Sequence, residues 1–145
     1  MKTGIIAAAM AIMALGLASC EDDTRTLRSE VAEDVRMFSG EFNVCHWTKV
    51  TDRDGLNTYY KHDISCPEIK HQVLRGGQIN CYLYTGEDSQ VPLPCVRHYE
   101  NENGNRWTRT IDCEYWVGGV TVYVTDSDFA GGVPDNMSFR IMLSW

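Results

Sequence analysis

The chain is short of basic residues and lacks a hydrophobic run long enough to cross a membrane. It carries 13 Lys and Arg against 20 Asp and Glu, a formal net charge of −7 over 145 residues. Nucleic-acid binding needs a basic surface for the phosphates, so this deficit argues against such a partner. The longest apolar stretch, residues 4–19, is shorter than the roughly 20 residues of a spanning helix. Hydrophobic residues still make up 43% of the chain, which argues against disorder.

Motifs for catalysis and metal binding are also absent from the sequence. It contains no G-x-S-x-G, S-x-x-K or H-E-x-x-H pattern, and no CxxC. His62, Cys66 and His71 match no regular zinc spacing. Asp126 and Asp128 are weak calcium candidates, because their loop offers fewer side chains than the about six to eight oxygens that calcium takes. We therefore expect no metal, no cofactor and no enzymatic activity, with paired carboxylates for glycoside hydrolysis left open.

The start of the chain has the layout of a secretory signal peptide. Lys2 precedes the apolar stretch, and Leu17-Ala18-Ser19-Cys20 closes it. The closing motif resembles a bacterial lipobox, which implies that Cys20 is lipidated and begins the mature chain. Residues 21–23, all acidic, resemble an export signal of Bacteroidetes surface lipoproteins. These resemblances imply a protein that a lipid holds in the outer membrane, facing the extracellular side.

The rest of the chain divides into a tether and one domain. Residues 20–34 are polar and charged, whereas residues 35–145 consist of short apolar runs separated by turn signals. The clearest expected strand is the last, in which alternate residues are large and apolar: Phe139, Ile141, Leu143 and Trp145. After the signal peptide at 1–19, we predict an all-β domain, an antiparallel β-sandwich of about seven strands.

The cysteine count of the domain is odd. With Cys20 acylated, five of the six cysteines remain, so an exported chain that forms disulfides keeps at least one free thiol. A hairpin centred on residue 88 would place Cys81 directly opposite Cys95. We favour a Cys81–Cys95 bridge on this ground.

Two other cysteine pairings stay open. A hairpin centred on Gly104, where Asn103-Gly104 is a good tight-turn pair, would place Cys95 opposite Cys113. Cys45 and Cys66 flank an earlier hairpin, but the expected centre of its turn does not put them directly opposite each other. The Cys45–Cys66 bridge is therefore the weaker prediction.

Aromatic side chains are candidates for ligand binding. They form 10% of the chain, and amphipathic rings on an exposed sheet face are typical of sugar-binding platforms. Tyr82 and Tyr84 alternate with apolar residues that should face the core, so we expect both rings on the outer face. Trp116 is the third candidate. Packing of most aromatic rings in the sandwich core is the competing interpretation.

The order of motifs in the domain resembles that of a group of small Bacteroidetes surface lipoproteins. The motifs that carry this resemblance are Trp47, Pro67-Glu68-Ile69, Gly77-Gln78-Ile79-Asn80-Cys81-Tyr82-Leu83-Tyr84, Leu93-Pro94-Cys95 and Ser138-Phe139-Arg140-Ile141-Met142-Leu143. The resemblance covers residues 35–145 and implies a β-rich outer-surface domain, without assigning an activity or functional residues. Cys95 departs from the pattern, because an aromatic residue usually follows Leu-Pro in the group.

Three functions fit these observations. The first is a non-enzymatic cell-surface lipoprotein whose domain binds a ligand or surface protein. The second is a carbohydrate-binding module that uses exposed Tyr and Trp side chains. The third is a small hydrolase with acidic catalytic residues. The expected partners are the membrane, through the lipid anchor, and a glycan or surface protein.

Overall fold

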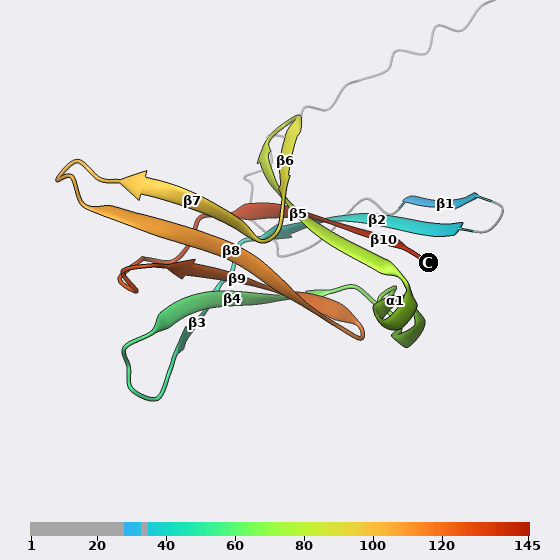
Figure 1. Ribbon diagram of the computed structural model, residues 1–145, viewed down its shortest axis with the longest axis horizontal. Coiled ribbons are helices and arrows are strands. Elements are labelled where there is room, and N and C mark those ends of the chain that lie inside the picture. Colours follow the sequence, from blue (N-terminus) through green and yellow to red (C-terminus); the bar gives the residue numbers. More distant parts are fainter. Residues whose placement is uncertain (1–27, 33–34) are drawn as a thin grey trace, which may run out of the picture.

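The structure, a computed structural model, describes residues 28–32 and 35–145. The expected signal peptide and lipidated Cys20 lie outside these residues. The described chain forms ten strands in two five-stranded antiparallel sheets (Figure 1), which confirms the all-β prediction. No helix within the described ranges is long and apolar enough to cross a membrane.

Sheet A contains the first, middle and last strands of the chain. Its spatial order is β1 (Arg28–Ala32), β2 (Val35–Val44), β10 (Met137–Ser144), β5 (Gln78–Gly86) and β6 (Ser89–Pro92). The last strand is thus the central one, and Phe139, Ile141 and Leu143 on its inner face are all buried, as the alternation predicts. Residues 28–32 were expected in the tether, but pairing of β1 with β2 adds them to the sheet.

Sheet B has the order β3 (Thr48–Thr51), β4 (Thr58–Ser65), β9 (Gly119–Asp126), β8 (Arg106–Trp116) and β7 (Cys95–Glu100). Its central strand, β9, buries Val120, Val122 and Val124 against sheet A. A six-residue helix, α1 (His71–Gly76), links β4 of sheet B to β5 of sheet A and buries Val73. The strand count exceeds the predicted seven because short strands such as β3 and β6, with four residues each, give no clear periodicity.

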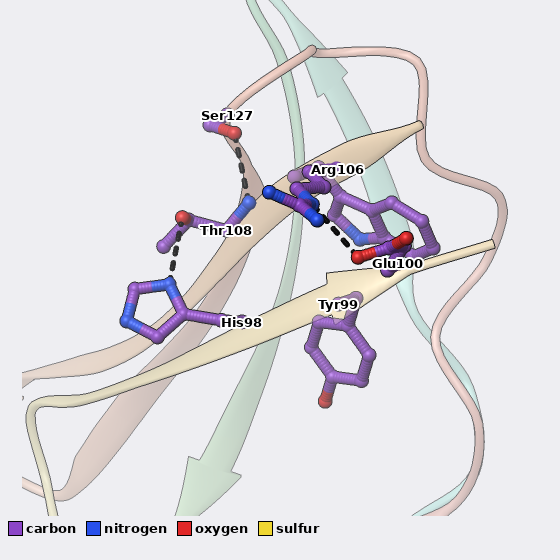
Figure 2. A pocket seen from close by; sticks show the side chains of 7 residues that line it. His98, Tyr99, Glu100, Arg106, Thr108 and Ser127 are labelled. Carbon is purple, nitrogen blue, oxygen red and sulfur yellow. Dashed lines mark hydrogen bonds and ion pairs between the residues drawn. The ribbon is translucent and has the colours of Figure 1, made fainter. Parts of the chain in front are cut away.

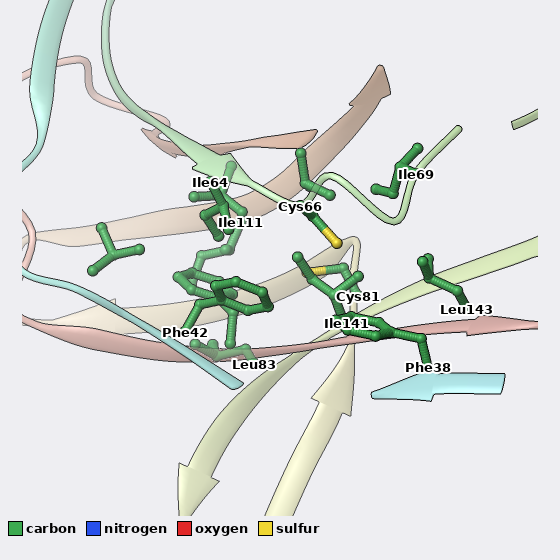
Figure 3. Packing of buried hydrophobic residues seen from close by; sticks show 14 of the residues in the cluster. Phe38, Phe42, Ile64, Cys66, Ile69, Cys81, Leu83, Ile111, Ile141 and Leu143 are labelled. Carbon is green, nitrogen blue, oxygen red and sulfur yellow. The ribbon is translucent and has the colours of Figure 1, made fainter. Parts of the chain in front are cut away.

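The two ends of the sandwich differ in what lies there. At one end, called here the helix end, α1 lies beside the start of β5 and the end of β10 (Figure 1). The side chains packed there include Cys66, Ile69 and Leu143 (Figure 3), and α1 adds the buried Val73. The β7–β8 hairpin projects from the opposite end, called here the hairpin end (Figure 1).

The register of the β5–β6 hairpin decides where the chain changes sheets. Tyr82 pairs with Pro92 and Leu83 with Val91. The Leu93 amide then donates to the Cys81 carbonyl at 2.9 Å. After Leu93-Pro94, whose peptide bond is cis, the chain enters β7 in sheet B. The hairpin is therefore centred one residue earlier than predicted, and Cys95 lies in the other sheet.

Candidate functional site

A groove of about 670 Å³ lies at the hairpin end of the sandwich, where strands of both sheets supply its lining. Sheet A contributes outward-facing polar side chains, and sheet B contributes Tyr99 and the buried Ile111. The complete lining is Glu41, Asn43, Leu83, Tyr84, Gly86, Glu87, Tyr99, Ile111, Asn136, Met137 and Ser138. The groove thus runs from the outer face of sheet A, over the ends of its strands, to the mouth between the sheets.

Strand alternation places the polar part of the groove. Glu41 and Tyr84 lie on the outer face of sheet A, because their neighbours Phe42 and Leu83 face the core. The Tyr84 hydroxyl donates to Glu41 Oε1 at 2.5 Å, across the intervening strand β10. This hydrogen bond raises the pKa of Tyr84, so the phenol stays neutral and fixed in position. Beside them, Ser138 Oγ donates to Asn43 Oδ1 at 2.6 Å.

The aromatic part of the groove is held by a stack on the β7–β8 hairpin. Tyr99 pairs directly with Trp107, and the two rings stack with centroids 5.4 Å apart. The Arg109 guanidinium lies 5.5 Å from the centroid of the Tyr99 ring, within cation–π range. Tyr99 nevertheless keeps 39% of its surface exposed. Trp107 and Arg109 therefore hold the Tyr99 ring in position, and the exposed part of the ring stays available to a ligand.

A buried ion pair anchors this stack to the sheet. Arg109 Nε and Nη2 donate to the two carboxylate oxygens of Asp126 at 2.7 and 2.8 Å. The interaction with Asp126 raises the pKa of Arg109. Gly131 lies against the same carboxylate, leaving no room there for a larger side chain. Bidentate pairing fixes the guanidinium plane under Tyr99.

A second, smaller hollow adjoins the groove. It has a volume of about 440 Å³ and shares Tyr99 with the groove (Figure 2). Its polar contacts are internal to the hairpin region, because Arg106 binds Glu100 and Thr108 binds both His98 and Ser127. These contacts are exposed, so they organise the surface more than they stabilise the fold.

The charge of the groove restricts its ligands. Among the described residues that line it, Glu41 and Glu87 are acidic and none is Lys or Arg. An anionic ligand would meet two carboxylates in the lining, while the nearby cations, Arg109 beneath Tyr99 and Arg140 near Tyr84, lie outside it. The amides of Asn43 and Asn136 and the hydroxyl of Ser138 offer both donors and acceptors. The groove is thus built for a neutral polar or cationic ligand.

The three predicted aromatic ligand-binding residues do not come together. Tyr84 lines the groove, whereas Tyr82 is half-buried and lies outside its lining. Trp116 is on the outer face of sheet B toward the helix end, where its ring covers Gly119. Its Nε1 donates to Thr121 Oγ1 at 3.1 Å. Trp116 and Tyr84 therefore cannot share one platform.

Tyr99 and Trp107 are the site residues that the strand patterns failed to single out. The predicted turn centre, Gly104, would have offset the two rings by two positions. In the structure the β7–β8 hairpin is centred one residue earlier, which puts Tyr99 opposite Trp107. The turn is fixed by Asn101, whose Oδ1 accepts from the amides of Asn103 and Asn105. An asparagine that closes a turn with its side chain is common in loops, so Asn101 is the residue in the sequence that could have indicated where this turn begins.

The predicted disulfides are corrected by the structure. Cys66, Cys81 and Cys95 are all free thiols, so neither the Cys81–Cys95 nor the Cys45–Cys66 bridge is present. Cys81 pairs with Ile141 in sheet A, whereas Cys95 pairs with Ile111 in sheet B. The alternative Cys95–Cys113 bridge is also absent, because both thiols are free and Cys95 lies opposite Ile111 instead of Cys113. The Cys81–Cys95 prediction was wrong because the chain leaves sheet A before Cys95, and the Cys95–Cys113 alternative because the β7–β8 hairpin is centred one residue earlier than predicted.

The two weak calcium candidates, Asp126 and Asp128, have other partners in the structure. Both carboxylate oxygens of Asp126 bind Arg109, and Asp128 accepts from the Ala130 amide at 3.1 Å as a turn cap. His62 Nδ1 contacts the His46 carbonyl instead of a second zinc ligand. Over the described part of the chain, no three His, Cys, Asp or Glu side chains are placed to share a metal ion.

Comparison with known proteins adds nothing to this geometry, because no family model, no curated protein and no solved structure matches the chain.

Proposed function

We propose that the domain is a non-enzymatic binding module for carbohydrate, held at the outer surface of the outer membrane by a lipid on Cys20. The groove at the hairpin end is the binding site. Tyr84 and Tyr99 would contact the sugar rings, and the carboxylates and amides between them would accept and donate hydrogen bonds to the hydroxyl groups. The resemblance to Bacteroidetes surface lipoproteins supports the location.

One observation carries the proposal: two tyrosine rings from different sheets line one groove together with acidic and amide side chains. Carbohydrate offers apolar ring faces for aromatic contact and hydroxyl groups for the polar side chains. An acidic or phosphorylated ligand fits poorly, since the groove lacks basic lining within the described residues. A protein partner would need a larger contact surface than this groove alone supplies, since stable interfaces bury about 800 Å² on each partner.

The binding test uses the full-length chain purified in detergent on an array of neutral and charged glycans, followed by calorimetry on the best neutral hit. Tyr84→Ala and Tyr99→Ala should each weaken binding about tenfold or more, equivalent to about 1.4 kcal/mol. Absence of binding to every neutral glycan would overturn the carbohydrate proposal. Release of shortened products from the bound glycan would overturn its non-enzymatic part and favour a hydrolase that uses Glu41 or Glu87.

Trp116→Ala is the matched control for these variants. Trp116 is 40% exposed, much like Tyr99, but it lies outside the groove lining. We expect its removal to leave glycan affinity unchanged. A loss of binding in Trp116→Ala with retention in Tyr99→Ala would move the site to the outer face of sheet B.

The anchor has a separate test. In cells fed an alkyne-labelled fatty acid, the wild-type chain should carry the label and remain with the outer membrane. Cys20→Ala should lose both properties, since a lipid attached to that thiol supplies the membrane affinity. Unchanged labelling in Cys20→Ala would overturn the assignment of the lipid to this residue.

A further inference from the structure

The centre of the sandwich holds a pair of thiols that the proposed binding function does not use. Cys81 is on the inner face of sheet A opposite Ile141, and Cys113 is on the inner face of sheet B opposite Val122. Both are free; Cys81 belongs to the hydrophobic core between the sheets, and Cys113 packs against that same core. Cys81 is only 1% exposed, while Cys113 is partly exposed.

We propose that Cys81 and Cys113 are a modification site, at which a reversible disulfide joins the two sheets. The oxidant is a disulfide, either a small molecule such as oxidised glutathione or the disulfide of a protein oxidase. The bridge is independent of the ligand in the groove. It needs only an oxidising compartment, which the export proposed above supplies.

The two thiols have different environments that suit successive roles in the exchange. Hydrogen bonding from Cys81 and from the Tyr115 hydroxyl lowers the pKa of Cys113 to about 7, despite its partial burial. The pKa of Cys81 is raised, by its interaction with Cys113 and by desolvation. Cys113 is therefore the thiol that reacts first, and Cys81 is the buried resolving thiol.

The reaction balances as an ordinary thiol–disulfide exchange. The Cys113 thiolate attacks one sulfur of the oxidant, which forms a mixed disulfide and expels the first oxidant thiolate. Cys81 then gives up its proton and attacks the Cys113 sulfur. This step forms the Cys81–Cys113 bond and expels the second oxidant thiolate, and the two expelled thiolates take up protons. Two protein thiols are oxidised and one external disulfide is reduced.

Cys66 is the competing partner for Cys81, and the structure gives a reason why it is disfavoured. Its sulfur lies in the same part of the core as that of Cys81 (Figure 3). However, the Cys66 thiol donates to Glu68 Oε2 at 3.6 Å. Burial and the nearby Glu68 carboxylate raise the pKa of Cys66 to about 12, so Cys66 does not compete with Cys113 as the thiol that first attacks the oxidant.

The test is mass spectrometry of the full-length chain after incubation with oxidised glutathione at pH 8, alkylation in denaturant and non-reducing digestion. We expect a peptide linked through Cys81 and Cys113, absent after treatment with dithiothreitol. Cys66→Ser and Cys95→Ser are matched controls that should form the same link. Alkylation of both Cys81 and Cys113 after oxidation would overturn the proposal, as would linkage of Cys81 to Cys66.

A second measurement follows the thermal stability of the chain. Oxidation of the wild-type chain should raise its Tm by roughly 5–15 °C, because a bridge between the sheets restricts the unfolded chain. Cys113→Ser should show no such rise. A linked peptide without a rise in Tm would overturn the placement of the bridge in the natively packed sandwich. Since neither readout involves glycan, failure here is distinct from failure of the proposed binding function.

Discussion

The helix end and the hairpin end of the sandwich are built from different kinds of residue. At the helix end, Ile69 and Val73 are fully buried and Leu143 almost so, and the packing is apolar. At the hairpin end, Tyr99 and Trp107 remain partly exposed, and the buried contact is the Arg109–Asp126 ion pair. One end excludes water with hydrocarbon, and the other keeps a polar groove open.

This difference separates stability from binding. Burial of apolar surface contributes about 25 cal/mol per Å² to the free energy of folding. A side chain buried in this way is not accessible to a ligand. A groove needs unburied side chains, so it must be held in place by directed contacts such as the bidentate ion pair and the aromatic stack. We therefore expect substitutions at the helix end to affect the free energy of unfolding and those in the groove to affect affinity.

The largest expected effect is at the helix end. Leu143→Ala should lower the free energy of unfolding by about 3–5 kcal/mol, because it leaves a cavity in a region with no solvent access. Urea denaturation measures the loss. Leu56→Ala is the matched control, since Leu56 is 73% exposed and should change stability by less than about 0.5 kcal/mol. Equal losses in the two variants would refute the assignment of the core.

The next effect tests the ion pair at the hairpin end. Asp126→Ala should lower the free energy of unfolding by about 2–4 kcal/mol, less than a fully buried pair would, because the Arg109 side chain keeps 16% exposure. It should also weaken glycan binding, since Tyr99 loses its support. Arg106→Ala is the control: it removes the exposed ion pair between Arg106 and Glu100, and Arg106 lies in β8 like Arg109. It should lower the free energy of unfolding by no more than about 1 kcal/mol. A neutral Asp126→Ala would show that the pair does not organise the hairpin.

A smaller effect should follow from alkaline pH. Burial and Glu68 raise the pKa of Cys66 from 9.0 to about 12, so between these values the folded chain keeps a proton that the unfolded chain has released. This contribution to stability is complete below pH 9 and is lost as pH rises toward 12. Urea denaturation under reducing conditions at pH 7.5, 9.5 and 10.5 should show the decline. A Cys66→Ser chain that declines equally would contradict this origin.

The smallest effect on stability concerns the groove itself. Tyr84→Phe removes an exposed hydrogen bond to Glu41, so the free energy of unfolding should change by less than about 0.5 kcal/mol. Glycan affinity should nevertheless fall, because Glu41 is no longer held in position. Calorimetry and urea denaturation on the same preparation compare the two quantities. A stability loss larger than the affinity loss would contradict the separation of the two ends.

The sequence predicts the sandwich well because its long strands have a regular alternation. The pattern at Phe139, Ile141 and Leu143 identifies an inner face without knowledge of the neighbours. Register is a different problem, because a shift of one residue changes every partner. The predicted centres of the β5–β6 and β7–β8 hairpins are each one residue late, and the sequence pattern does not show that the chain changes sheets between Cys81 and Cys95.

The groove was harder to predict than the fold. Its lining comes from strands that are far apart in the chain, so the proximity of Tyr84 to Tyr99 depends on how the two sheets pack. The aromatic pattern identified Tyr84 correctly as an outward-facing residue. It gave no means of separating Tyr84 from Trp116, because sequence alternation shows which face a side chain occupies and not which end of the sheet.

The position of β10 has a consequence for the order of folding. This strand lies between β2 and β5, which have no pairing with each other, so sheet A is two separate hairpins until residues 137–144 join it. Sheet B has the local pairs β7–β8 and β8–β9 and is less dependent on distant segments. A chain that requires so distant a contact folds slowly. Until residues 137–144 have been synthesised, sheet A therefore lacks the strand that joins its two halves.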